Sequence, residues 1–299
     1  MRAGGCRVKD KRVSIQEAAS AVGNGCRLVM GGMVLQRQPM ALVYELVRRG
    51  VRDLTVATFV GGNAIDLLVA VGAVQRIEAA YMGMGPFGFA PHFRRAVEAG
   101  LVEVDDISES AMMARFKAAG AGLPFLPHRS LLGTDMPTYS RHVREITCPF
   151  TGQLLHAVRA LESDVTILHA HTADAYGNVQ FPLQRNTDEL DQVFAKAAKT
   201  LIVTVERIIP HEEVLSRSTQ TIIPFHWVDM VVEVPYGAHP GSVDGLYRED
   251  EAHLRRYVEA AKTPEAFRAY LDEFVTGVQD HWQYVERIGG LRHLSSLHE

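Results

Sequence analysis

Residues 27–50 read RLVMGGMVLQRQPMALVYELVRRG and contain the pattern that decides the fold. A short apolar run, Arg27–Met30, ends in two glycines. Pro39 then opens a stretch in which apolar residues recur every three or four positions, and Gly50 ends it. A strand, a loop and an amphipathic helix in this order are the first part of a βαβ unit, which predicts a parallel sheet.

The same alternation continues to about Pro235. The apolar runs are rich in Val, Ile and Leu, as expected of strands that are covered on both faces. We therefore predict an α/β fold with an open, mainly parallel sheet and helices on both faces. The further strands are expected at 54–57, 77–80, 101–104, 165–170, 201–205 and 228–234, with crossover helices at 109–121 and 190–197.

The two ends of the chain differ from the middle. Residues 1–12 are basic, and no apolar stretch typical of a signal peptide follows them, so they are expected to form a flexible extension. From about residue 241 the pattern is helical only. Because no linker-like composition interrupts the rest, we predict that residues 13–299 form one domain with a helical C-terminal segment.

The composition excludes several classes of function. The 299 residues are 47% hydrophobic and carry a formal charge of −4, which offers no basic field for a nucleic acid. The uncharged run 79–91 is too short to cross a membrane and is interrupted by glycine and proline. The three cysteines lie far apart in the sequence, which fits a reducing compartment. We expect a cytoplasmic enzyme with no nucleic-acid or membrane partner.

A glycine-rich segment, GMGPFG at residues 83–88, matches the dinucleotide motif G-x-G-x-x-G. Pro86 and Pro91, however, delay the next helix to about His92, so no helix N-terminus meets the third glycine. We interpret the segment as a substrate loop at the end of a strand, with Gly85 and Phe87 as contacts. An NAD-binding oxidoreductase is the alternative.

Polar residues near the ends of predicted strands are candidates for the site. Arg37 is the only charge in its loop and could bind an anion, although an exposed loop arginine is usually solvated. Glu206 ends a strand, where an ion pair with Arg207 or a helix cap is the alternative. His239 lies beside Gly237 after the last strand and is a candidate polar group of the pocket.

His169 and His171 alternate along a strand and therefore point the same way, with Asp174 close behind them. They could begin a metal site, but a third and a fourth ligand cannot be named. Histidines that hydrogen-bond to a carboxylate or to the backbone are commoner, so no metal is predicted.

Five segments resemble the α subunits of family I coenzyme A transferases, nearest to the glutaconate CoA-transferase type. The resemblance runs from about Val13 to Leu297 and rests on residues 29–32, 37–39, 122–127, 203–206 and 235–247. It implies the open α/β fold of that family and no bound cofactor. It also implies an acyl-CoA and a carboxylic acid as substrates.

In such enzymes a β subunit of similar fold supplies a nucleophilic glutamate. The Ser-Glu-Asn-Gly motif of that subunit is not found in this chain. The resemblance therefore implies a heteromeric partner, with Gly31, Gly32 and the loop 82–91 forming a wall of the pocket that can present backbone N–H groups.

Residues 108–129 are also similar to the α subunits of ring-cleaving hydrolases of steroid degradation, which break a C–C bond of a cyclic acyl-CoA with water. This resemblance implies catalytic roles for Glu109 and Arg129. Otherwise Glu109 belongs to the first turn of its helix, and Arg129 pairs with a surface acid. The transferase is the main expectation and the hydrolase is the alternative.

Overall fold

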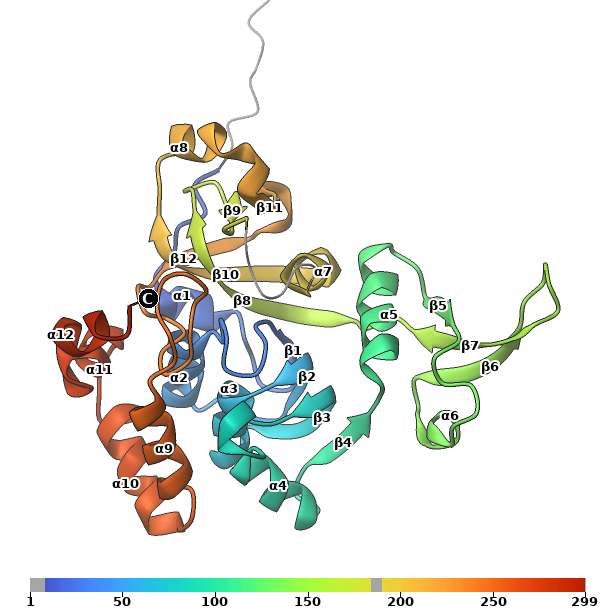
Figure 1. Cartoon of the computed structure of the whole chain (residues 1–299), viewed down its shortest axis with the longest axis horizontal. Coiled ribbons are helices and arrows are strands. Elements are labelled where there is room, and N and C mark those ends of the chain that lie inside the picture. Colours follow the sequence, from blue (N-terminus) through green and yellow to red (C-terminus); the bar gives the residue numbers. More distant parts are fainter. Residues whose placement is uncertain (1–8, 184–189, 299) are drawn as a thin grey trace, which may run out of the picture.

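The structure is a computed structural model and describes residues 9–183 and 190–298. Seven strands of its main sheet are parallel, in the spatial order β4–β3–β2–β1–β8–β10–β12. Figure 1 shows them as the centre of the molecule. They are β1 (Arg27–Met30), β2 (Leu54–Gly61), β3 (Val74–Met82), β4 (Glu103–Asp106), β8 (Ser163–Ala173), β10 (Ala198–Ile208) and β12 (Met230–Glu233).

The predicted α/β fold is confirmed, and each of the seven expected strands is present. The strand β4 begins two residues later than expected. Leu101 still closes the preceding helix, because its N–H donates to the carbonyl of Ala96. Two short strands, β9 (Val179–Gln180) and β11 (Thr221–Ile223), extend the end of β8 in antiparallel pairing.

Helices cover both faces of the sheet, as predicted. One face packs against α1 (Ile15–Ser20), α2 (Met40–Arg49) and α3 (Asn63–Ala70), with α4 (Pro91–Glu98) outside α3. The other face packs against α5 (Glu109–Gly120) and α7 (Leu190–Ala197). Alternate residues of one strand point to opposite faces, so Leu28 belongs to the first core and Val29 to the second.

The C-terminal segment is helical, as expected, and packs on the first face. It consists of α9 (Glu251–Ala260), α10 (Pro264–Phe274), α11 (His281–Arg287) and α12 (Gly290–Ser295). A further short helix, α8 (His211–Ser216), follows β10. No helix among the described residues is long and apolar enough to span a bilayer.

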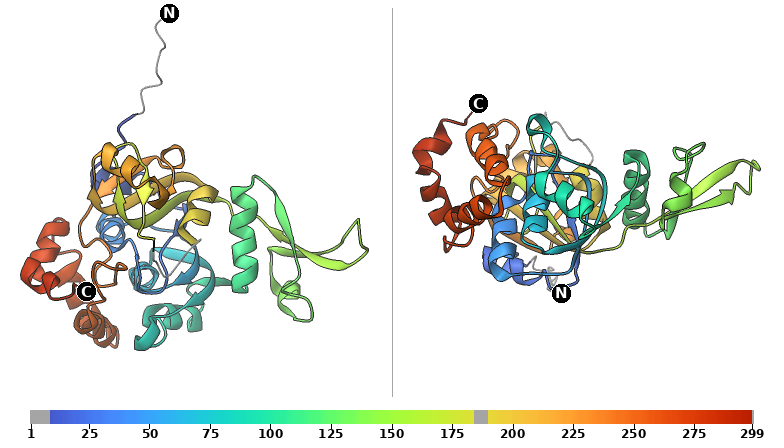
Figure 2. Two further views of the ribbon diagram at one scale, coloured as in Figure 1. Left: turned by 45° about the horizontal axis from the view of Figure 1, so that its top comes forward. Right: turned by 90° about the horizontal axis from the view of Figure 1, so that it is seen from below.

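A small antiparallel sheet, which the sequence pattern did not predict, projects from the main body on the side opposite the C-terminal helices (Figure 2). Its order is β5 (Phe125–His128), β7 (Leu154–Arg159) and β6 (Val143–Thr147), with α6 (Met136–Tyr139) beside it. Pro127 fits here because β5 is an edge strand. The division of residues 13–299 into a single domain stays a prediction.

The expected N-terminal extension is shorter than predicted. Residues 1–8 lie outside the described residues, but Lys11 and Arg12 are already attached to the body. The N–H of Lys11 donates to Ala175, its carbonyl accepts from Val231, and Arg12 forms a β-bridge with Val231.

Candidate active site

The candidate site residues follow the carboxyl ends of parallel strands and therefore lie along one edge of the main sheet. Gly31 follows β1, Gly85 follows β3 and Glu109 follows β4. Glu206 is near the end of β10, and Tyr236 comes after β12. Parallel pairing brings these positions, which are far apart in sequence, to the same side of the molecule.

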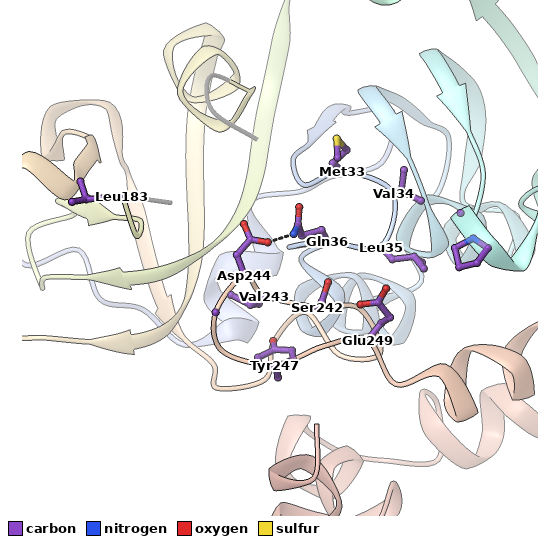
Figure 3. Close-up of a pocket in the computed structure, with 13 residues that line it drawn as sticks. Met33, Val34, Leu35, Gln36, Leu183, Ser242, Val243, Asp244, Tyr247 and Glu249 are labelled. Atoms are coloured by element: carbon purple, nitrogen blue, oxygen red, sulfur yellow. Dashed lines mark hydrogen bonds between the residues drawn. The ribbon is translucent and has the colours of Figure 1, made fainter. Parts of the chain in front are cut away.

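A polar cavity of about 830 Å³ opens at this edge. It lies between the loop after β1, the turn Gly85–Phe87 after β3, and the segment 242–249 that precedes α9 (Figure 3). Its volume is in the range of small-molecule sites in proteins. The lining residues are Met33, Val34, Leu35, Gln36, Gly85, Pro86, Leu183, Ser242, Val243, Asp244, Gly245, Tyr247 and Glu249.

The loop after β1 is held in a strained conformation. Val34 has φ of 54°, which is rare for a β-branched residue. A Cβ at Gly62 would lie 1.7 Å from the carbonyl oxygen of Val34, and one at Gly241 would lie 1.9 Å from that of Leu35. Two glycines therefore permit the close approach of backbone that shapes this wall. Strain of this kind is commonly found at functional sites.

Arg37 lies behind the wall and does not line the cavity. Its side chain is 1% exposed, its Nη2 donates to Asp191 Oδ2 at 2.9 Å, and its Nη1 pairs with Asp244. The expectation of an exposed loop arginine is therefore wrong. Two carboxylates already balance its charge, so Arg37 holds the loop after β1 against α7 and the segment 242–249.

Glu206 is a buried carboxylate with three hydrogen-bond donors. It accepts from His169 Nε2 at 2.7 Å, from the Tyr247 hydroxyl at 2.6 Å and from the N–H of Tyr236 at 2.6 Å. Burial raises its pKa, but these hydrogen bonds outweigh burial and leave the pKa of Glu206 below its usual value. Neither alternative suggested for it is found, because Arg207 pairs with Glu213 instead.

The two histidines of β8 are hydrogen-bonded and do not converge on one point. His169 contacts the carboxylate of Glu206, and His171 Nε2 contacts the backbone oxygen of Asp244 at 2.8 Å. Asp174 is engaged elsewhere, with His211 and the turn at Asn178. The expected hydrogen-bonding arrangement of this pair is confirmed.

His239 does not reach the cavity. It is 1% exposed, and its two ring nitrogens contact the Tyr284 hydroxyl at 2.6 Å and Asp250 at 3.2 Å. The expectation of a pocket polar group is therefore corrected. The chain turns after β12 so that the ring points into the C-terminal helices.

The glycine-rich segment does not have the geometry of a dinucleotide site. Gly85–Phe87 form a 3₁₀ turn, and α4 begins only at Pro91, as expected from the prolines. Gly85 lines the cavity. Phe87 adjoins it in the chain and packs against the guanidinium of Arg255 at 5.3 Å. Gly31 and Gly32 precede the lining residue Met33.

Glu109 and Arg129 lie together outside this cavity. Ser110 Oγ is 2.8 Å from His128 Nε2, which brings the start of α5 next to the end of β5. Both Glu109 and Arg129 are exposed. Neither has an ion-pair partner among the described residues, so the expected surface acid beside Arg129 is not found. Glu109 does occupy the first turn of α5.

The cavity contains residues that were not singled out individually from the sequence. Asp244 is paired with Arg37 and accepts from Gln36. Glu249 is half-buried and has no hydrogen-bond or ion-pair partner for its carboxylate among the described residues. Figure 3 shows it near Ser242. No local pattern marks Glu249, because its place in the wall depends on the course of the chain after β12.

A parallel α/β sheet with a polar cavity at its carboxyl edge defines an enzyme chain of the open α/β class. Comparison with known proteins gives the family. The chain belongs to the coenzyme A transferase family, whose model matches residues 12–234.

Named relatives include α-type subunits. The α-type subunit of glutaconate CoA-transferase from Acidaminococcus fermentans is 35% identical, over 94% of this chain and 93% of its own. The cholesterol ring-cleaving hydrolase IpdA subunit of Rhodococcus jostii is 33% identical, over 92% of this chain and 95% of its own. An uncharacterised protein of Archaeoglobus fulgidus is 39% identical, and this chain spans 64% of its length. The expected kinship with α subunits of this family is confirmed.

Solved structures agree with this assignment. The crystal structure of glutaconate coenzyme A-transferase from Acidaminococcus fermentans has a TM-score of 0.90 at 32% identity, covering 96% of this chain and 95% of that one. A variant of the decarboxylase AibA/AibB has a TM-score of 0.75 at 30% identity, covering 87% and 98%. The names of these relatives comprise transferases, hydrolases and a decarboxylase, so the fold does not determine the reaction.

Proposed function

We propose that the chain is the α subunit of a heteromeric coenzyme A transferase that moves CoA between an acyl-CoA and a carboxylic acid. Relatives named as the α-type subunits of glutaconate and 3-oxoadipate CoA-transferases support this activity. The cavity of about 830 Å³ at the carboxyl edge is large enough for an acyl group and part of its carrier. Gly31, Gly32, Gly85 and Phe87 belong to its wall or adjoin it.

The state of the carboxylates in and behind this wall is the observation that carries the proposal. Glu206 accepts three hydrogen bonds, and Asp244 is paired with Arg37. A carboxylate whose lone pairs are occupied and whose pKa is lowered is a poor nucleophile. The attacking glutamate therefore comes from a β-type partner that closes the open side of the cavity. In this arrangement Arg37, Glu206 and His239 act by holding the wall in place.

The test uses the complex of this chain with its β-type partner. Glutaconyl-CoA or 3-oxoadipyl-CoA is added without an acceptor acid, and the products are reduced with borohydride and analysed by mass spectrometry. A transferase accumulates CoA as a thioester on a glutamate, and we expect the adduct on the partner. The isolated α chain should carry no adduct and show no turnover.

Glu249 provides the sharpest contrary outcome. It is the cavity carboxylate without a partner among the described residues, so an adduct on Glu249 would show that the α chain carries the nucleophile. Turnover by the isolated chain would have the same meaning. The matched variant Glu249→Gln should leave the partner's adduct intact if the proposal holds.

A ring-cleaving hydrolase is the second candidate, because Glu109 and Arg129 are neighbours at an exposed edge. A carboxylate and a guanidinium that are free of other partners can act as a general base and an anion contact. The relative from Rhodococcus jostii named as a cholesterol ring-cleaving hydrolase subunit supports this candidate. Incorporation of ¹⁸O from labelled water into the acid formed from a cyclic diketo acyl-CoA, with no adduct, would favour the hydrolase.

A further inference from the structure

A second cluster of ligand-type side chains lies behind the cavity wall. It consists of His239 after β12, Asp250 at the N-terminus of α9, and His293 on α12. His239 Nε2 is 3.2 Å and His293 Nε2 is 2.5 Å from the same atom, Asp250 Oδ2. The three ligand atoms all lie within 4.8 Å of one another.

We propose that His239, Asp250 and His293 bind one divalent transition-metal ion of the zinc type. Two imidazole nitrogens and one carboxylate form a common zinc ligand set, which leaves a fourth position for water. Ligand atoms about 2 Å from the metal in a tetrahedral site lie roughly 3.4 Å from one another. The contact of His239 with Asp250 already has this spacing. The side chain of His293 is 35% exposed and has room to move outward.

The charge around Asp250 favours a cation. Asp250 is 3% exposed, and in the described part of the chain no lysine or arginine forms an ion pair with it. Buried carboxylates are usually paired with a cation or bound to a metal. A comparable cluster, Glu78, Asp105 and His142, is different, because it is surrounded by arginines that already neutralise it: Arg27, Arg76, Arg115 and Arg141.

Neighbouring groups orient the proposed ligands. Nδ1 of His239 is 2.6 Å from the Tyr284 hydroxyl, and Asp250 Oδ1 accepts from the N–H of His253 at 2.9 Å. Such outer contacts fix ring orientation in metal sites. Metal binding requires that the ring proton of each neutral histidine sits on Nδ1. The Nδ1–H of His239 can then donate to the Tyr284 hydroxyl, so the proton moves within the ring and none has to leave.

The site would join parts of the chain that are far apart in sequence. Glu249 lines the cavity and directly precedes Asp250, while His239 follows the last parallel strand. A metal ion here would tie α12 and the start of α9 to the back of the cavity wall. This role does not depend on which reaction the cavity serves.

The test is a titration of the full chain, stripped with EDTA, with Zn²⁺ in a non-chelating buffer by calorimetry. We expect one ion per chain and a rise in thermal midpoint. Co²⁺ in the same site should give visible absorption bands of four-coordinate geometry. His293→Asn removes a partly exposed ligand and keeps a donor for Asp250, and it should weaken binding by at least roughly 100-fold.

His298→Asn is the matched control, because His298 is an exposed histidine near the same end that contacts Tyr236 and not Asp250. It should bind Zn²⁺ like the unchanged chain. If the unchanged chain binds no Zn²⁺, or if His293→Asn binds it with the same affinity and stoichiometry, the cluster is a hydrogen-bonded triad only and the proposal is overturned.

Discussion

The hydroxyl of Tyr247 donates a hydrogen bond of 2.6 Å to Oε1 of Glu206. Tyr247 lines the cavity, whereas Glu206 lies near the end of β10. This contact therefore connects the segment before α9 with the main sheet. It also keeps a buried carboxylate satisfied at a place where the chain provides no lysine or arginine partner among the described residues.

Replacing Tyr247 with Phe should destabilise the fold. The hydroxyl donates to a charged, buried acceptor, and such hydrogen bonds contribute about 1.5–3 kcal/mol. Urea unfolding should show this loss in the free energy of unfolding. Tyr236→Phe is the control, since that hydroxyl contacts the exposed His298. An equally small loss in both variants would show that the contact with Glu206 contributes nothing.

Stability should depend on pH through Asp66. Burial raises the pKa of Asp66 to about 6, although hydrogen bonds from Tyr257, Phe93 and His92 oppose the rise. The folded chain therefore binds a proton more tightly than the unfolded chain between about pH 4 and pH 6. Stability contributed by this group is present below pH 4 and is lost as the pH rises through 6.

Asp66→Asn cannot titrate and isolates this effect. The stability of the variant relative to the unchanged chain should rise by on the order of 1–3 kcal/mol between pH 4 and pH 7. Urea unfolding at intervals of one pH unit measures it. Parallel stability curves for the two proteins would contradict the raised pKa.

Replacing Glu109 with Gln should separate the two candidate reactions. A transferase complex should keep its rate within roughly ten-fold, whereas a hydrolase that uses Glu109 as its base should lose about 10²–10⁴ in rate. Steady-state kinetics of the assembled complex decide between them. Glu145→Gln is the control, because Glu145 is an exposed glutamate of the same small sheet. We expect Glu109→Gln to be tolerated.

Gly62→Ala should disrupt the wall of the cavity. The added Cβ would lie 1.7 Å from the carbonyl oxygen of Val34, and backbone cannot move aside as a flexible side chain can. We expect a loss of about 1–3 kcal/mol in stability, together with weaker binding of acyl-CoA by the complex. Gly23→Ala meets nothing within 4 Å and should be neutral. Similar behaviour of the two variants would show that the wall is soft.

The sequence alone was sufficient for the architecture and the family. The runs at Arg27–Met30 and 201–205 are strands because residues buried on both faces of a sheet must be apolar, and this requirement is visible in a few consecutive residues. Helices such as α2 also carry their own start and stop signals. The small sheet escaped because its strands are half exposed and β5 contains Pro127.

Only the tertiary structure decided how the polar residues are used. Arg37 pairs with Asp191 and Asp244, which are 154 and 207 positions away in the chain. His239 turns from the cavity toward Asp250, which in turn meets His293 on the last helix. A residue's type shows that it can be charged or bind a metal. Its partner depends on which strand ends and helices the topology brings together, and that arrangement is a property of the whole chain.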